Sequence, residues 1–166
     1  QEFNEIKSIF MDIFPLVEDI DFTKERFFDG TVIPLLKIKE KGVSSWIMQN
    51  EISSGMFRTL SQITILVLAQ DGDVILIDEF ENGLGVNCID RLAEQIIEPE
   101  KDVQVIMTSH HPYIINNIPF KRWKIVTRTT SDVSVLSADD LKIGEHSKHE
   151  AFMQLIQTKA FKTGQK

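Results

Sequence analysis

The stretch "DVILIDEFENGLG", residues 73–85, decides the predicted fold. Its apolar run from Val74 to Ile77 is too short for a helix and too uniform for a half-exposed strand. Such a run is typical of a strand that is buried on both faces in a parallel sheet. Two adjacent carboxylates, Asp78 and Glu79, follow at the carboxyl end of this strand, which in open α/β sheets is the edge where ligands bind.

On both sides of this strand, helical and strand patterns alternate. The segments expected nearest to it are a helix over 55–70, a helix over 88–98 that Pro99 stops, and a strand over 103–108. Strands and helices in this order predict an α/β fold with a largely parallel sheet flanked by helices.

The two ends of the chain have other patterns. An amphipathic helix is expected over 3–17, with Pro15 disturbing its last turn. Residues 31–48 predict a β-hairpin, and Pro34 within its first strand suggests an edge position. The prediction is completed by a short helix after "HHP", two strands within 123–137 and a helix over 149–161.

Composition narrows the classes of protein. The chain has 166 residues, of which 42% are hydrophobic, so it can bury the core of one domain. The formal net charge of −7 excludes a basic footprint for nucleic acid over the chain as a whole. With Cys88 as its single cysteine and no apolar run long enough for a bilayer, the chain is expected in the cytoplasm, without a membrane partner.

The adjacent carboxylates are candidates for metal chemistry. Two neighbouring acids repel each other unless a cation or a proton separates them, and Mg²⁺ is the natural cation because it prefers oxygen ligands and arrives with phosphates. Asp78 is then the candidate metal ligand, and Glu79 the group that orients or deprotonates a water. The alternative is an acidic turn at the rim of the sheet.

The strand over 103–108 leads into "TSHHP", residues 108–112. Neighbouring parallel strands place their carboxyl ends at the same edge of the sheet, so His110 is expected near Glu79. An imidazole there could hydrogen-bond a phosphate or the attacking water. The alternative is a histidine that only caps a loop carbonyl, which is the role expected for His111.

Small residues precede the helix that leads to the acidic strand. Ser53, Ser54 and Gly55 stand at its expected N-terminus, with Arg58 one turn further on. A helix N-terminus offers unpaired N–H groups and a partial positive charge, which attract phosphate. These residues are therefore candidates for anion binding, and the alternative is an ordinary serine N-cap.

Taken in order, these motifs resemble the head of an ABC-type ATPase, and more narrowly the branch with the structural-maintenance-of-chromosomes, RecF and overcoming-lysogenization-defect proteins. The matching region covers residues 50–127. "ISSGMFR" is similar to the signature loop at Ser53 and Gly55, although Ser54 replaces a usual glycine and Met56 a polar residue. "VILIDE" resembles the Walker B strand.

The resemblance implies a role for each motif. Asp78 would bind magnesium, Glu79 would be the catalytic glutamate, and "TSHHP" would supply the switch histidine His110. "ENGLG" resembles the D-loop, which would place Asn82 and Gly83 at the nucleotide.

The printed sequence departs from the family at one point, because it contains no Gly-x-x-x-x-Gly-Lys-Ser/Thr loop and no Gly-Lys pair. Because it also begins with Gln1, we expect the C-terminal lobe of a P-loop NTPase, inactive without a Walker A lobe from elsewhere. The expected organisation is one partial domain over 1–166, with a helix and hairpin in 1–50, the motif core in 51–130 and a C-terminal strand and helix in 131–166.

The resemblance also implies partners. Two heads of this family, here a homodimer, would hold ATP between them, with Ser53, Ser54 and Gly55 serving the partner's nucleotide. Hydrolysis would drive an attached DNA-related effector in repair or anti-phage defence, with DNA or a nuclease bound through other regions. The alternatives are a non-catalytic regulatory module and a metal-dependent nuclease that uses Asp78, Glu79 and Glu81.

Overall fold

The computed structural model describes residues 1–97, 101–144 and 148–164. The chain divides into two compact units, Gln1–Met107 and Thr108–Lys166, which are described separately. The helices of the first unit are α1 (Glu2–Ile13), α2 (Ser54–Leu68) and α3 (Val86–Ile97). Its strands are β1 (Val17–Arg26), β2 (Val32–Glu40), β3 (Ile47–Met48), β4 (Val74–Ile77) and β5 (Gln104–Met107).

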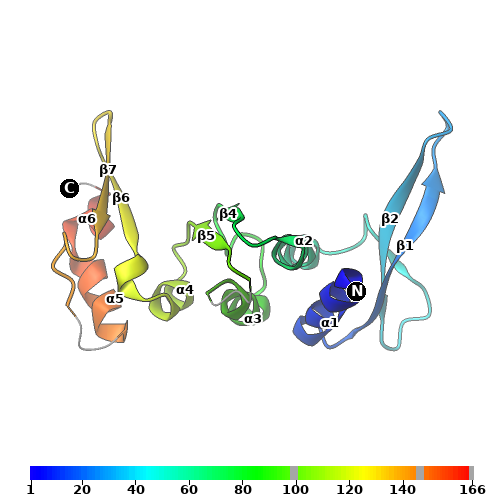
Figure 1. Ribbon diagram of the computed structural model, residues 1–166. Coiled ribbons are helices and arrows are strands. Elements are labelled where there is room, and N and C mark those ends of the chain that lie inside the picture. The colour runs from blue at the N-terminus through cyan, green and yellow to red at the C-terminus, as the bar shows by residue number, and fades with distance from the viewer. Residues whose placement is uncertain (98–100, 145–147, 165–166) are drawn as a thin grey trace. The chain divides into compact units, whose positions relative to one another are not determined.

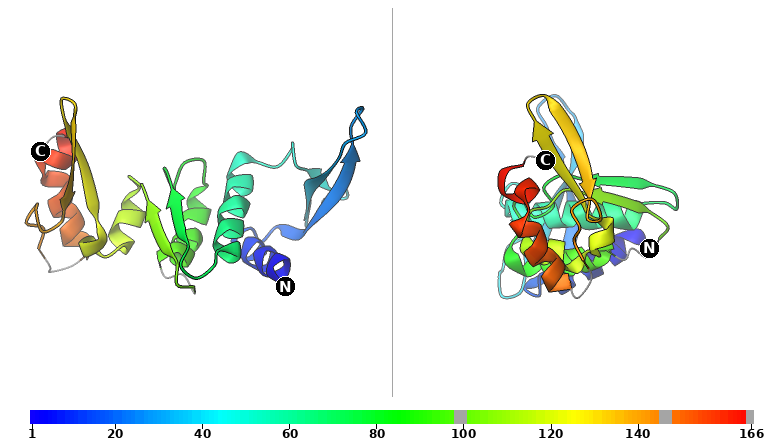
Figure 2. Two further views of the ribbon diagram at one scale, coloured as in Figure 1. Left: turned by 45° about the horizontal axis from the view of Figure 1, so that its top comes forward. Right: turned by 90° about the vertical axis from the view of Figure 1, so that its left-hand side faces the viewer.

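The predicted α/β fold is confirmed. Strands β4 and β5 pair in parallel, in a register that aligns Ile77 with Met107, and α3 runs beside them (Figures 1 and 2). Among the described strands, the other pairings are antiparallel. Parallel pairing is therefore confined to the two strands that flank the acidic motif. The helix end predicted at Pro99 lies outside the described residues.

Helix α1 forms as expected but ends earlier. Its buried residues Ile6, Phe10 and Ile13 form one apolar stripe, and the helix ends two residues before Pro15. The prediction that the helix reaches Val17 is wrong, because Val17 begins β1.

Strand β1 was missing from the sequence prediction. It pairs with β2 along almost its whole length, but the pairing register shifts between Val17 and Asp19. Such an irregularity breaks the alternation of apolar and polar residues that marks a strand in a sequence. Only Val17 and Ile20 of β1 are buried, and charged residues fill most of the rest.

The predicted hairpin is present as β2 and β3, but β2 is the central strand in the order β1-β2-β3. The prediction that Pro34 lies in an edge strand is therefore wrong. Strand β3 pairs only with Lys37 and Ile38, so this part of the ladder does not reach Pro34. On the other side Pro34 faces Lys24.

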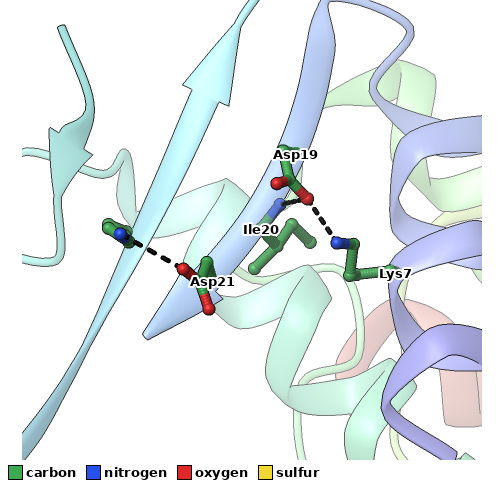
Figure 3. Close-up of polar contacts among 5 residues, drawn as sticks. Lys7, Asp19, Ile20 and Asp21 are labelled. Atoms are coloured by element: carbon green, nitrogen blue, oxygen red, sulfur yellow. Dashed lines mark hydrogen bonds and ion pairs between the residues drawn. The ribbon is translucent and has the colours of Figure 1, made fainter. Parts of the chain in front are cut away.

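Two ion pairs hold β1 in place (Figure 3). Lys7 of α1 donates to Asp19, and Lys37 of β2 pairs with Asp21 at 3.2 Å. The Lys7 ammonium is the main cause that holds the pKa of Asp19 below its ordinary value. The pKa of Asp21 is also lowered, first by the N–H of Phe22 and then by Lys37. The first contact joins α1 to β1, and the second joins β1 to β2.

The expectation that β4 is buried on both faces is wrong. Ile75 is 7% exposed, but Val74 and Leu76 on the other face are 56% and 74% exposed. The neighbouring strand repeats this pattern with Ile106, which pairs with Leu76 and is 51% exposed. One face of the parallel pair is thus apolar and uncovered within this unit.

The C-terminal end of α2 is anchored by Lys101. Its ammonium donates to the carbonyl oxygens of Val67 and Ala69, the latter at 2.8 Å. These are among the last carbonyls of the helix, which have no partner within it. Phe80, which directly follows Glu79, and Leu92 of α3 are completely buried.

The second unit contains α4 (Pro112–Asn117), a 3₁₀ helix (Phe120–Arg122), β6 (Lys124–Thr129), β7 (Asp132–Ser137), α5 (Lys148–Gln157) and α6 (Lys159–Thr163). Strands β6 and β7 form the predicted late hairpin. The hydrophobic core of this second unit contains Trp123, whose Nε1 donates to the Ile118 carbonyl at 3.1 Å. None of the helices in the described ranges is long and apolar enough to span a bilayer.

Candidate active site

The predicted acidic motif lies at the carboxyl end of β4. Asp78 and Glu79 follow Ile77 directly, and both side chains are exposed. Because Ile77 is aligned with Met107, the carboxyl ends of β4 and β5 form one edge, as the sequence predicted. This is the position where α/β sheets bind ligands. We call residues 78–85 the acidic loop.

Glu79 has an unusual backbone for its residue type. Its φ of 45° lies in the left-handed region, which costs free energy for residues other than glycine. Its carbonyl oxygen accepts hydrogen bonds from Arg58 Nη2 at 2.9 Å and from the N–H of Asn82 at 2.9 Å. The side chain of Asn82 also donates to Glu79 Oε2 at 2.9 Å. Hydrogen bonds therefore hold both the main-chain carbonyl and the carboxylate of Glu79.

The first turn of α2 has the geometry of a serine N-cap. Ser53 is the capping residue, and its hydroxyl oxygen accepts from the N–H of Met56 at 3.2 Å. Ser53 and Ser54 are exposed, so the turn is open to an anion from outside. Capping and anion binding are compatible, because a cap satisfies only some of the free N–H groups of the turn.

Helix α2 touches the acidic loop through two glycines. A Cβ built on Gly55 would lie 2.7 Å from the carbonyl oxygen of Gly83, closer than real Cβ contacts. Gly83 has a φ of 73°, a conformation that side chains rarely adopt. Both glycines are therefore required by the fold, and they place the first turn of α2 directly against the loop.

Sequence reasoning missed one further contact of this loop. Gln62, which is 6% exposed, lies one turn beyond Arg58 and its Nε2 is 3.5 Å from the carbonyl oxygen of Phe80. Its Oε1 is buried and has no hydrogen-bond partner among the residues that the structure describes. A glutamine directly before the largely apolar run "ITILVL" of the same helix is the signal that could have identified it.

The donor chemistry at the strand end fits Mg²⁺. Asp78 supplies a carboxylate, and Mg²⁺ bound with a nucleotide needs one or two carboxylates besides phosphate and water. Within the described ranges, no three His, Cys, Asp or Glu side chains are placed to hold one metal ion. The structure thus does not join Asp78, Glu79 and Glu81 into the metal site that the nuclease hypothesis requires.

His110 lies in the second unit, three residues after β5 ends. Its side chain is exposed, and the next residue, His111, donates its N–H to Ser109 Oγ at 3.1 Å. The predicted short helix is present as α4, which begins at Pro112, and among the described residues His111 makes no side-chain capping bond to it. Since Glu79 belongs to the first unit, proximity of His110 to Glu79 stays a prediction.

The comparisons with known proteins concern both family and fold. A family model described as "AAA domain, putative AbiEii toxin, Type IV TA system" matches residues 10–116. The solved structure from "Structural biochemistry of ATP-driven dimerization and DNA stimulated activation of SMC ATPases" matches with a TM-score of 0.63 at 17% identity. That match covers 94% of this chain and 91% of the solved chain, which shows the same fold. No curated protein matches the sequence.

Proposed function

Because the chain belongs to the AAA domain family whose model it matches, we propose that it forms part of an ABC-type ATPase head that binds and hydrolyses ATP. One observation carries this proposal: Asp78 and Glu79 stand at the carboxyl end of a parallel strand, and α2 is fixed against the loop that follows them. This brings the proposed Walker B, D-loop and signature residues into one structural unit.

Asp78 and Glu79 have different tasks in the proposed reaction. Asp78 would hold Mg²⁺, which supplies positive charge beside the phosphates of ATP when it is bound. Glu79 would align a water and accept its proton as the water oxygen bonds to the γ-phosphorus and the bond to ADP breaks. The hydrogen bond from Asn82 fixes one oxygen of that carboxylate.

The remaining site residues divide between two heads in this proposal. Ser53, Ser54 and Gly55, at the open first turn of α2, would bind the nucleotide of a second copy, while His110 would serve the chain's own nucleotide. Asn82 and Gly83 would lie at the nucleotide held between the two heads. An anion site that is complete only in the dimer makes ATP binding and association linked equilibria.

The uncovered face of β4 and β5 supports a further partner. Val74, Leu76 and Ile106 expose apolar side chains there, although strands of this type are usually covered on both faces. The printed sequence contains no Gly-Lys pair. We therefore propose that a segment carrying the phosphate-binding lysine packs on this face and covers it.

The proposed effector rests on analogy with the matched solved structure. The matched solved structure concerns ATPases whose dimerisation is driven by ATP and whose activation is stimulated by DNA. We propose a DNA-related effector here, acting in the cytoplasm, with repair or anti-phage defence as its setting. Because the chain has a net charge of −7, its DNA or nuclease contacts would be made by other regions.

Signature-loop substitution tests this function in the full-length protein. Ser54→Arg places a bulky side chain at the open turn and should abolish ATP-driven dimerisation while each monomer still binds ATP. Ser44→Arg, at an exposed position between β2 and β3, is the matched control and should behave as the unmodified protein. Light scattering with and without ATP measures the dimer. A protein that neither binds nor hydrolyses ATP would instead support the regulatory alternative.

A further inference from the structure

We propose that Arg58 is a positioning residue that couples the signature helix to Glu79, and that it does not bind the nucleotide. The inference rests on the proposed function, in which Glu79 aligns the attacking water. It also changes the role that the sequence suggested, since Arg58 was expected to bind the nucleotide.

The contacts of Arg58 are directed at the acidic loop. Its Nη2 donates to the carbonyl oxygen of Asp78 at 3.1 Å and to that of Glu79 at 2.9 Å. A guanidinium carries five N–H donors and no acceptor, so carbonyl oxygens are suitable partners for it. The group therefore bridges the two residues that carry the proposed chemistry.

These contacts matter because the Glu79 backbone is unfavourable by itself. A left-handed glutamate persists only where surrounding groups determine its conformation. Arg58 and the N–H of Asn82 both donate to the Glu79 carbonyl, and the Asn82 side chain donates to its carboxylate. Without Arg58, one of the bonds that fix this backbone is lost, and the carboxylate keeps only its bond from Asn82 to direct it.

One face of α2 makes all of these connections. Gly55, Arg58 and Gln62 are spaced by three and four residues, so they lie on the same side of the helix. Gly55 meets the Gly83 carbonyl, and Gln62 reaches the Phe80 carbonyl. The first turn of this helix is the proposed contact with the partner's nucleotide. A shift of that turn is therefore transmitted to Glu79, with Arg58 as the link.

The test uses the full-length protein with Arg58→Ala, Arg58→Lys and, as the matched control, Arg91→Ala at an exposed position of α3. We expect Arg58→Ala to lower kcat about 100-fold, the effect of misplacing a catalytic group, with the affinity for ATP unchanged. Arg58→Lys should recover part of the loss, because an ammonium can still donate to a carbonyl. The Arg58→Lys variant stays informative even if Arg58→Ala does not fold.

Two results separate a positioning role from nucleotide binding. Combined with Glu79→Gln, Arg58→Ala should leave ATP binding and ATP-driven dimerisation intact. If ATP affinity falls together with kcat, or if kcat does not change, the proposal is overturned.

A third readout is independent of turnover. Hydrogen exchange at the Asn82 amide, measured without nucleotide, should become faster in Arg58→Ala and stay unchanged in Arg91→Ala. If the unmodified protein does not hydrolyse ATP, the proposed function fails, and this exchange rate still decides whether Arg58 fixes Glu79. Unchanged exchange would overturn the positioning role.

Discussion

Gly55 and Gly83 meet backbone to backbone: a Cβ on Gly55 would lie 2.7 Å from the Gly83 carbonyl oxygen. This contact joins the start of α2 to the acidic loop more closely than any side-chain packing would permit. Because Gly83 also needs a positive φ, neither glycine can be exchanged without moving the loop that follows Glu79.

Substitution of Gly55 tests that contact. Gly55→Ala should reduce the free energy of unfolding by about 1–3 kcal/mol, since the added methyl group meets backbone that has little room to shift. Urea unfolding measures the loss. Gly144→Ala is the matched control, because nothing lies within 4 Å of a Cβ at Gly144. Equal stability of the two variants would show that the contact is looser than described.

The two faces of β4 should respond differently to truncation. Ile75→Ala removes a buried side chain and should cost about 2–5 kcal/mol of unfolding free energy in the chain of residues 1–166. Leu76→Ala should change it by less than about 0.5 kcal/mol, because Leu76 is exposed. In the full-length protein Leu76→Ala should lower the unfolding free energy clearly if another segment covers this face. A neutral effect there would contradict the proposed lobe.

The contact between Lys7 and Asp19 should make stability depend on pH in acid. The pKa of Asp19 is held below 3.8, mainly by the hydrogen bond from Lys7. Its stabilising contribution is therefore present above pH 3.8 and is lost as the pH falls through the folded pKa. The pair is partly exposed, so Asp19→Asn should lower the unfolding free energy at pH 7 by less than about 1 kcal/mol.

Thermal unfolding across this pH range measures the difference between the two proteins. The difference should shrink as the pH drops below 3.8. Asp12→Asn, at an exposed position on α1, is the control and should change the unfolding free energy at pH 7 by less than about 0.5 kcal/mol. A difference that persists undiminished in strong acid would rule out the carboxylate charge as its cause.

The elements that bear the acidic site could be predicted because their patterns are local. A short apolar run followed by Asp-Glu located β4 and its carboxyl end, and the small residues before an apolar helix located the N-terminal region of α2. The strand β1 could not be predicted, since its bulge and its charges remove the alternation on which such a prediction depends.

The role of Arg58 was also beyond sequence reasoning. Its partners are the main-chain carbonyls of Asp78 and Glu79, and carbonyl groups are the same at every position of a chain. Likewise, the exposure of Leu76 depends on what covers the sheet, and the residues of β4 itself are equally apolar on both faces. The sequence supplies candidates for the chemistry, and tertiary structure determines which contacts hold their backbone.

In the proposed function Glu79 activates water for ATP hydrolysis, and Glu79→Gln in the full-length protein is the sharpest test of that role. Glutamine keeps the size of the side chain but cannot accept the proton, so we expect hydrolysis to fall at least about 100-fold while ATP stays bound in a stable dimer. Glu94→Gln, exposed on α3, is the control. ATP turnover at the unmodified rate in Glu79→Gln would contradict the account.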